Sequence, residues 1–292
     1  MQPGKAPSNS MELDRPTLTN RFAKKVAPTL SRLLCSDQCL RLARMADAYL
    51  NFLLGKGAGT GWDMAHEITA ARSKIHRDDP IIFDIGANVG EWAEQAVQVI
   101  SPRLIYMFEP SPECRARITT AAIPSSKLIP FAVGEVAGRA VLHSSSVVDG
   151  SASLHVRDDS YFADRTYSGL EIEVVTLDQV IASENVDFID FLKMDIEGHE
   201  LFALKGARDA LSKRQIGALS FEFGSGNINS RTYFRDFWKL LRDAGFKLWR
   251  ITPGGKLVPI DSYYEDLEYF RGVSNYIAEL VDHPFNRAER QR

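Results

Sequence analysis

The sequence predicts an α/β protein with a doubly wound, mostly parallel sheet that carries helices on both faces. Three observations support this fold class. Short apolar runs alternate with helical segments from residue 81 onward, the runs are apolar throughout, and a glycine-rich turn follows the first run. This combination is typical of parallel strands that are buried between two layers of helices.

The composition is that of a globular protein. The 292 residues are 45% hydrophobic and 25% charged, with 20 Gly and 13 Pro, which excludes collagen-like and wholly disordered chains. Three cysteines, Cys35, Cys39 and Cys114, are too few for a disulfide framework. We therefore expect reduced thiols in a protein with a sizeable core of its own.

Two segments precede the alternating region. Residues 1–28 are rich in Pro, Ser, Thr and Lys without periodicity, and we expect a flexible N-terminal lead there. Over residues 29–79 we expect a helical cap, because Leu42, Met45 and Tyr49 recur at helical spacing. A second short helix of this cap is expected to open at Thr60 and to stop before Asp78.

The alternating region covers residues 80–282, and residues 283–292 are expected to form a C-terminal tail. Its helices include one with the apolar stripe of Trp92 and Ala96. Residues 134–180 interrupt the pattern, and we expect an inserted hairpin whose mobile loop acts as a lid. The predicted strands lie near residues 81–85, 104–108, 128–133, 188–192, 218–221, 246–251 and 273–277.

A turn suited to close approach of a ligand follows the first predicted strand. It contains Asp84, Gly86, Asn88 and Gly90. Glycines at such a turn let the backbone bend sharply and approach a ligand. The spacing is neither Gly-x-Gly-x-x-Gly nor a P-loop, so a dinucleotide or nucleoside triphosphate is disfavoured. A tight turn without a ligand is the alternative.

Acidic residues follow two further strands. Glu109, before Pro110, ends the second strand 25 residues after Asp84, where an acid can accept hydrogen bonds from the ribose hydroxyls of an adenosine-containing ligand. Asp195, Glu197, His199 and Glu200 cluster after a later strand. Such a cluster could bind a cation or take a proton from a substrate, although acids also stabilise helix starts.

Taken together, these motifs resemble the FkbM family of class I S-adenosylmethionine-dependent methyltransferases. The resemblance covers about residues 60–280. It implies a seven-stranded sheet whose last strand is antiparallel, with S-adenosylmethionine (SAM) over the glycine turn, Glu109 on its ribose, and Asp84 and Asp195 near its methionine end. The motifs in chain order are Asp84-x-Gly86-x-Asn88-x-Gly90, Phe108-Glu109-Pro110, Ser153-Leu154, Val175-Thr176-Leu177-Asp178, Lys193-x-Asp195-x-Glu197-Gly198-x-Glu200 and Phe221-Glu222-Phe223.

The resemblance also implies the acceptor, a hydroxyl on a sugar or a natural-product-like small molecule. An alcohol holds its proton at neutral pH, so a base would help. His199, Asp195 and Glu197 are the candidates, while Glu222 and Ser153 are expected to bind the acceptor. A divalent metal between Asp195 and Glu222 is a weaker alternative, and we expect none.

Two other function classes predict different motifs. An oxidoreductase that binds NAD or a nucleotide sugar predicts Gly-x-Gly-x-x-Gly and Tyr-x-x-x-Lys, and the sequence contains neither. A non-catalytic interaction module with the same fold predicts decayed cofactor motifs, whereas these are intact. The methyltransferase is therefore favoured.

Charge and hydropathy bear on partners and location. The net charge of −3 argues against a nucleic-acid partner. No stretch is long and apolar enough for a membrane span, no secretory pattern opens the chain, and we expect a cytoplasmic protein. Homo-oligomer formation stays open. Residues 1–50 carry a net charge of +4, which fits a solvated tail or a weak contact with an anionic membrane or a partner.

Overall fold

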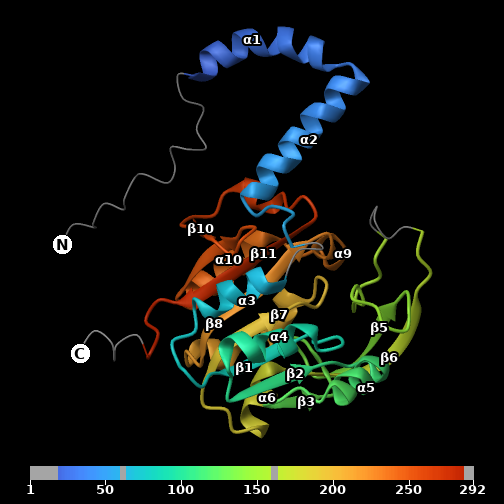
Figure 1. Cartoon of the computed structure of the whole chain (residues 1–292), viewed down its shortest axis with the longest axis vertical. Helices are drawn as coiled ribbons and strands as arrows, with labels where there is room; N and C mark the ends of the chain where they lie inside the picture. Colours follow the sequence, from blue (N-terminus) through green and yellow to red (C-terminus); the bar gives the residue numbers. More distant parts are fainter. Residues whose placement is uncertain (1–18, 60–63, 159–163, 286–292) are drawn as a thin grey trace, which may run out of the picture. The chain divides into compact units, whose positions relative to one another are not determined.

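The computed structural model describes residues 19–59, 64–158 and 164–285. The chain divides into two compact units, Met1–Phe52 and Leu53–Arg292 (Figure 1). Thr60, where the second cap helix was expected to open, lies outside the described residues. So do residues 1–18 of the predicted lead, 159–163 of the predicted lid and 286–292 of the predicted tail.

The N-terminal unit contains two helices, α1 (Thr19–Leu34) and α2 (Asp37–Leu53). Helix α1 starts inside the range predicted to be a flexible lead. The helix predicted from Leu42, Met45 and Tyr49 is present as α2, but none of its residues is buried. Its packing as a cap therefore stays a prediction.

The larger unit is built on one mixed sheet of eight strands, one more than the resemblance implies. The additional strand is β10, which forms an antiparallel hairpin with β9. The spatial order of the sheet is β10 (Leu257–Ile260), β9 (Phe246–Ile251), β11 (Val273–Leu280), β8 (Ile216–Gly224), β7 (Ile189–Met194), β1 (Ile81–Ile85), β2 (Leu104–Phe108) and β3 (Ser126–Ile129).

Strand direction follows the expected α/β plan. β3, β2, β1, β7 and β8 are parallel neighbours, and β11 is antiparallel to both β8 and β9. The chain runs outward from β1 to β3 and then returns to β7 on the other side of β1. Ligands of open α/β sheets bind at such a switch in strand order, at the carboxyl ends of the strands.

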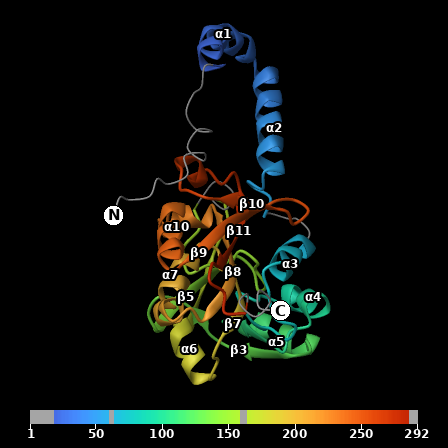
Figure 2. The same cartoon turned by 90° about the vertical axis from the view of Figure 1, so that its left-hand side faces the viewer.

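Helices cover both faces of the sheet. Figure 2 shows α3, α4 and α5 on one side and α6, α7 and α10 on the other. Two apolar clusters fill the layers between helices and sheet. The bounds are α3 (Met64–Arg72), α4 (Glu91–Ile100), α5 (Pro112–Ala121), α6 (Leu177–Ser183), α7 (Glu200–Lys205), α8 (Arg208–Ser212), α9 (Gly226–Ser230), α10 (Phe234–Asp243) and the 3₁₀ helix η1 (Glu265–Glu268).

Two helices show how the apolar pattern positions these layers. The predicted stripe of α4 is buried at Trp92, Ala93 and Ala96. Helix α3 buries Ile68 and Ala71 in the same cluster. The second helix of the predicted cap is thus part of the sheet's covering layer.

A second sheet of three strands forms the insert. Its strands are β4 (Ala132–Val133), β5 (Gly138–Ser144) and β6 (Ser168–Val175), in the order β4-β6-β5. The predicted hairpin is β5 and β6. The strand expected over 128–133 is instead divided between the two sheets, and Pro130, which has no N–H for a ladder, lies at the break. The insert ends earlier than predicted, since Thr176 caps α6.

Candidate functional site

The glycine turn after β1 brings backbone into close contact with the end of β7. Gly86 has a φ of +80°, and a Cβ there would lie 2.0 Å from the Asp195 carbonyl oxygen. Gly86 and Ala87 donate backbone hydrogen bonds to the Phe108 carbonyl, at 3.1 and 3.0 Å. Gly90, with a φ of +88°, faces Ile123 instead. The turn therefore requires glycine at 86, where the backbone closely approaches the end of β7, and at 90, where it packs against Ile123.

Glu109 is fixed by two backbone donors at the end of β2. Its Oε2 accepts from the Asn88 N–H at 2.9 Å and its Oε1 from the Ser111 N–H at 2.8 Å. The residue is buried, and burial raises the pKa of its carboxyl to about 7. Because each carboxylate oxygen has a further lone pair, Glu109 can still accept hydrogen bonds from a ligand.

A cavity of about 570 Å³ opens beside this carboxylate. That volume is typical of small-molecule sites. Its wall comes from the ends of β1, β2 and β7, from residues 131–133, and from the insert at 144–154 and 166–170. Eight predicted site residues line it, namely Gly86, Asn88, Glu109, Pro110, Ser153, Asp195, Glu197 and His199.

Three predicted site residues do not line the cavity. Gly90 packs against the α5 side of the fold, as described above. Asp84 is fully buried, and its carboxylate accepts from the Lys193 ammonium at 3.1 Å. This placement supports a role for Asp84 in holding Lys193 rather than in direct contact with a ligand. Glu222 lies on β8, next to β7.

Glu222 belongs to a cluster of carboxylates at the carboxyl ends of β7 and β8. One oxygen from each of Asp195, Glu197 and Glu222 lies within 4.8 Å of the others. Burial, followed by the charges of Asp195 and Glu197, raises the pKa of Glu222 well above its ordinary value. The cluster could bind hydroxyl groups or hold a divalent cation, and acids also gather in this way without one.

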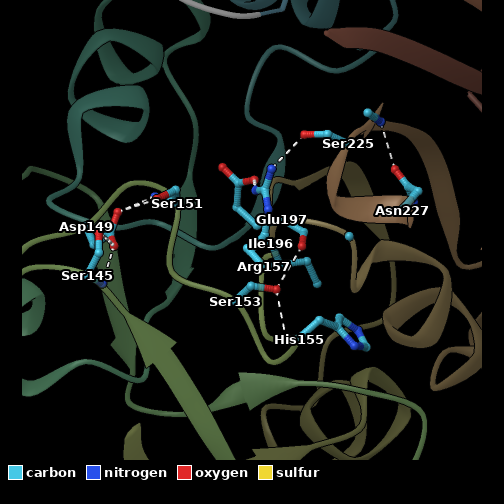
Figure 3. Close-up of polar contacts among 12 residues, drawn as sticks. Ser145, Asp149, Ser151, Ser153, His155, Arg157, Ile196, Glu197, Ser225 and Asn227 are labelled. Atoms are coloured by element: carbon cyan, nitrogen blue, oxygen red, sulfur yellow. Dashed lines mark hydrogen bonds and ion pairs between the residues drawn. The ribbon is translucent and has the colours of Figure 1, made fainter. Parts of the chain in front are cut away.

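A buried arginine from the insert reaches this cluster. Arg157 is 3% exposed, pairs with the Glu197 carboxylate and donates to Ser225 Oγ at 2.7 Å. Figure 3 shows its guanidinium between these two side chains. Burial and Asp195 raise the pKa of Glu197 to about 8, against the lowering effect of Arg157.

Further contacts connect the insert to the loop after β7. Ser153 Oγ donates to the Glu197 carbonyl at 2.8 Å and accepts from the His155 N–H at 3.1 Å (Figure 3). His155 Nε2 lies 3.0 Å from His199 Nδ1. Burial and the neighbouring His155 lower the pKa of His199 to about 3. His199 is therefore neutral and a weak base in this arrangement.

The loop of the insert above the cavity is organised by Asp149. Ser145 and Ser151 each donate a backbone and a hydroxyl hydrogen bond to its carboxylate, at 2.6 to 2.9 Å. Burial would raise the pKa of Asp149, but these bonds outweigh it and hold the pKa low. The loop is thus a defined wall of the cavity over its described residues.

Two residues of the site carry no role in the sequence prediction. Lys193 could have been noticed, because a lysine that continues an apolar strand must find a buried partner. Arg157 stands alone in a Ser- and Asp-rich segment. No spacing or motif marks it, and only the fold brings it to Glu197.

An open sheet with a cavity at the switch in strand order defines a Rossmann-like α/β protein with a small-molecule site. The chain belongs to the FkbM methyltransferase family, since the family model described as methyltransferase FkbM domain matches residues 84–248. The oxidoreductase alternative is not supported by this membership.

Two curated relatives are similar to part of the chain. The 2-O-methyltransferase NoeI of Sinorhizobium fredii is 28% identical over 156 residues, which cover 49% of this chain and 64% of the relative. The hexuronic acid methyltransferase AglP of Haloferax volcanii is 26% identical over 168 residues, covering 57% and 63%. The chain thus spans just under two thirds of the length of these relatives.

Among solved structures, the methyltransferase FkbM from Methylobacillus flagellatus KT is 19% identical, with a TM-score of 0.45. The match covers 69% of this chain and 44% of that one. Within the described part of the chain, no helix has the length and apolar character needed to cross a membrane.

Proposed function

We propose that this protein is a SAM-dependent methyltransferase that methylates a hydroxyl of a sugar or a similar polyhydroxylated small molecule. The observation that carries the proposal is Glu109, held by two backbone donors at the wall of the cavity beside the glycine turn. Family membership supports methyl transfer, and the names of the two relatives support a sugar-like acceptor.

The residues of the cavity fit SAM. Glu109 would accept hydrogen bonds from the ribose hydroxyls, and Gly86 with Asn88 would let the ligand approach the backbone. Pro110 would line the adenosine end. Asp195 also lines the cavity and would be an acid suited to the cationic end of SAM. Bound SAM would supply a methyl group activated by its attachment to a positively charged sulfur.

The chain's own part in the reaction would be alignment and proton removal. The acceptor oxygen would form a bond to the methyl carbon while the carbon–sulfur bond breaks and leaves its electron pair on sulfur. The hydroxyl proton would pass to a carboxylate. Glu197 suits this task because its pKa of about 8 lies near the operating pH, which favours general base catalysis. Asp195 and His199 are the other candidate bases.

The carboxylate cluster would also bind the acceptor. Glu222 lies within 4.8 Å of Asp195 and Glu197 and could accept hydrogen bonds from other acceptor hydroxyls. Ser153 would act by fixing the Glu197 backbone, since its hydroxyl already donates to that carbonyl. This arrangement favours a small acceptor that carries several hydroxyls over a nucleic acid. We further infer a cytoplasmic protein.

Two experiments test the proposal in sequence. In a thermal-unfolding scan, a ligand at 100 times its dissociation constant adds about 2.7 kcal/mol, so SAM and its demethylated product should each raise Tm by several degrees while NAD does not. Isotope-labelled SAM is then offered with a panel of monosaccharides and hexuronic acids. Label on a sugar hydroxyl supports the proposal, and a shift with NAD alone would contradict it.

A further inference from the structure

The N-terminal unit presents an apolar helix face that the unit itself does not bury. On α2, the exposed fractions are 65% for Leu42, 68% for Met45, 63% for Tyr49 and 62% for Leu50, and none of its residues is buried. A helix of a globular protein normally buries such a stripe. Clustered exposed apolar side chains of this kind mark a binding surface.

The spacing places these side chains on one face. Leu42, Met45, Tyr49 and Leu53 follow one another at intervals of three and four residues, the period of one side of a helix. Arg41 and Arg44 fall outside this stripe. α2 is therefore an amphipathic helix whose apolar side is not buried within its own unit.

Helix α1 adds a strongly cationic character. Its 16 residues contain Arg21, Lys24, Lys25 and Arg32 and no Asp or Glu. Lys25 and Arg32 are exposed and lie seven residues apart, on one side of the helix. Leu30, half exposed, lies outside that side. Helix α1 thus has apolar positions on one side, and its charged side chains are all cations. This combination favours an anionic surface as the partner.

We propose that α1 and α2 lie on an anionic phospholipid bilayer, with their apolar faces at the headgroup boundary and the cations of α1 at the lipid phosphates. A second copy of the chain is a poorer occupant, because two copies of α1 would bring only like charges together. The lipid surface supplies both the apolar boundary and the complementary charge. The proposal does not depend on the methyltransferase activity.

Vesicle flotation of the full chain tests this surface. The probes are vesicles of phosphatidylcholine alone and vesicles that also contain phosphatidylglycerol. We expect the protein to float with the phosphatidylglycerol vesicles and to be released by high salt, since screening weakens surface attraction. Each Lys or Arg near such a surface contributes about fivefold in affinity. Lys25→Gln with Arg32→Gln should therefore weaken binding about 25-fold.

Matched variants separate the apolar and charge contributions. Leu42→Gln with Met45→Gln removes apolar contact and should abolish flotation. The control pair, Lys213→Gln with Lys239→Gln, removes two exposed cations of the larger unit and should bind as the unchanged protein does. Equal Tm values for all variants would show that the larger unit is intact.

Four outcomes would overturn the proposal. The first is the absence of flotation with either vesicle. The second is equal binding to neutral and anionic vesicles. The third is a loss of binding in the control pair equal to that of Lys25→Gln with Arg32→Gln. The fourth is a stable dimer in light scattering that Leu42→Gln with Met45→Gln dissociates, without vesicle binding, which would assign the face to a second copy.

Discussion

Removal of the Arg157 guanidinium should cost stability and shift the pH dependence of activity. Arg157→Met keeps the length of the side chain and removes its charge. The side chains of Arg157 and Glu197 are 2% and 19% exposed, so the variant leaves a carboxyl largely buried without its cation. Loss of one partner of a buried pair costs about 3–5 kcal/mol when the remaining group stays charged. Unfolding is therefore compared above the Glu197 pKa of about 8, where its partial exposure places the expected cost at about 3 kcal/mol.

The assay is thermal and urea unfolding with a double-mutant cycle. For a domain of this size about 3 kcal/mol corresponds to a fall in Tm of about 6–12 °C. The double variant Arg157→Met with Glu197→Gln should recover part of this loss, because no uncompensated charge remains. The control is Arg139→Met, which breaks an exposed pair with Glu171 on the same insert and should cost less than about 1 kcal/mol.

Activity provides a second readout. Arg157 lowers the pKa of Glu197, so its loss should raise that pKa further. In the pH profile of kcat, the pH at which Glu197 ionises should then shift to a higher value. A fall in Tm no larger than that of Arg139→Met, together with an unchanged pH profile, would refute this reasoning.

Three further predictions concern the turn, the buried acids and the carboxylate cluster. Gly86→Ala should weaken SAM binding, measured by calorimetry, at least tenfold and lower Tm, because a Cβ would meet the Asp195 carbonyl. The control Gly138→Ala, whose Cβ would meet nothing within 4 Å, should leave SAM binding unchanged. Equal effects of the two variants would contradict the role of the turn. Burial raises the pKa of Glu67 on α3, of Glu109 and of Glu200 on α7 from 4.5 to about 7. Since the folded state then binds more protons, their stabilising contribution is complete below pH 4.5 and lost as pH rises through about 7. His199, whose pKa is lowered in the folded protein, makes stability rise with pH only below its ordinary pKa of 6.5. The urea concentration at the unfolding midpoint should therefore fall between pH 6.5 and 8. A rise over that range would show that the acids are ionised at lower pH. Methyl transfer should survive a chelator, because Arg157 already supplies a cation to Glu197; a loss that Mg²⁺ restores would place a metal among Asp195, Glu197 and Glu222.

The parts of the fold that sequence predicts best are those set by local pattern. The apolar stripe of α4 and the runs of β1, β2 and β7 appear as buried elements, because periodicity and burial are directly coupled. The additional strand β10 was missed. It forms through pairing with β9, and its Leu257-Val258-Pro259-Ile260 sequence contains a proline that disfavours a strand except at an edge.

The site shows the same division. The residues of the glycine turn and Glu109 could be predicted because a strand followed by a tight turn is a local signal. The ion pair of Lys193 with Asp84 and that of Arg157 with Glu197 join segments 109 and 40 residues apart. Such partners are determined by how the sheet and the insert fold together, which no single motif records.

The central claim is that Glu109 beside the glycine turn binds SAM, and isothermal titration calorimetry of Glu109→Gln tests it most directly. Removing the charge from a carboxylate that bonds two ribose hydroxyls should weaken SAM binding by about 1.5–3 kcal/mol or more. The control Glu94→Gln removes an exposed acid of α4 and should bind SAM as the unchanged protein does. Weak binding in Glu109→Gln alone, with a cooperative unfolding transition retained, is the predicted result. Equal SAM affinity in all three proteins would contradict the assignment of this cavity.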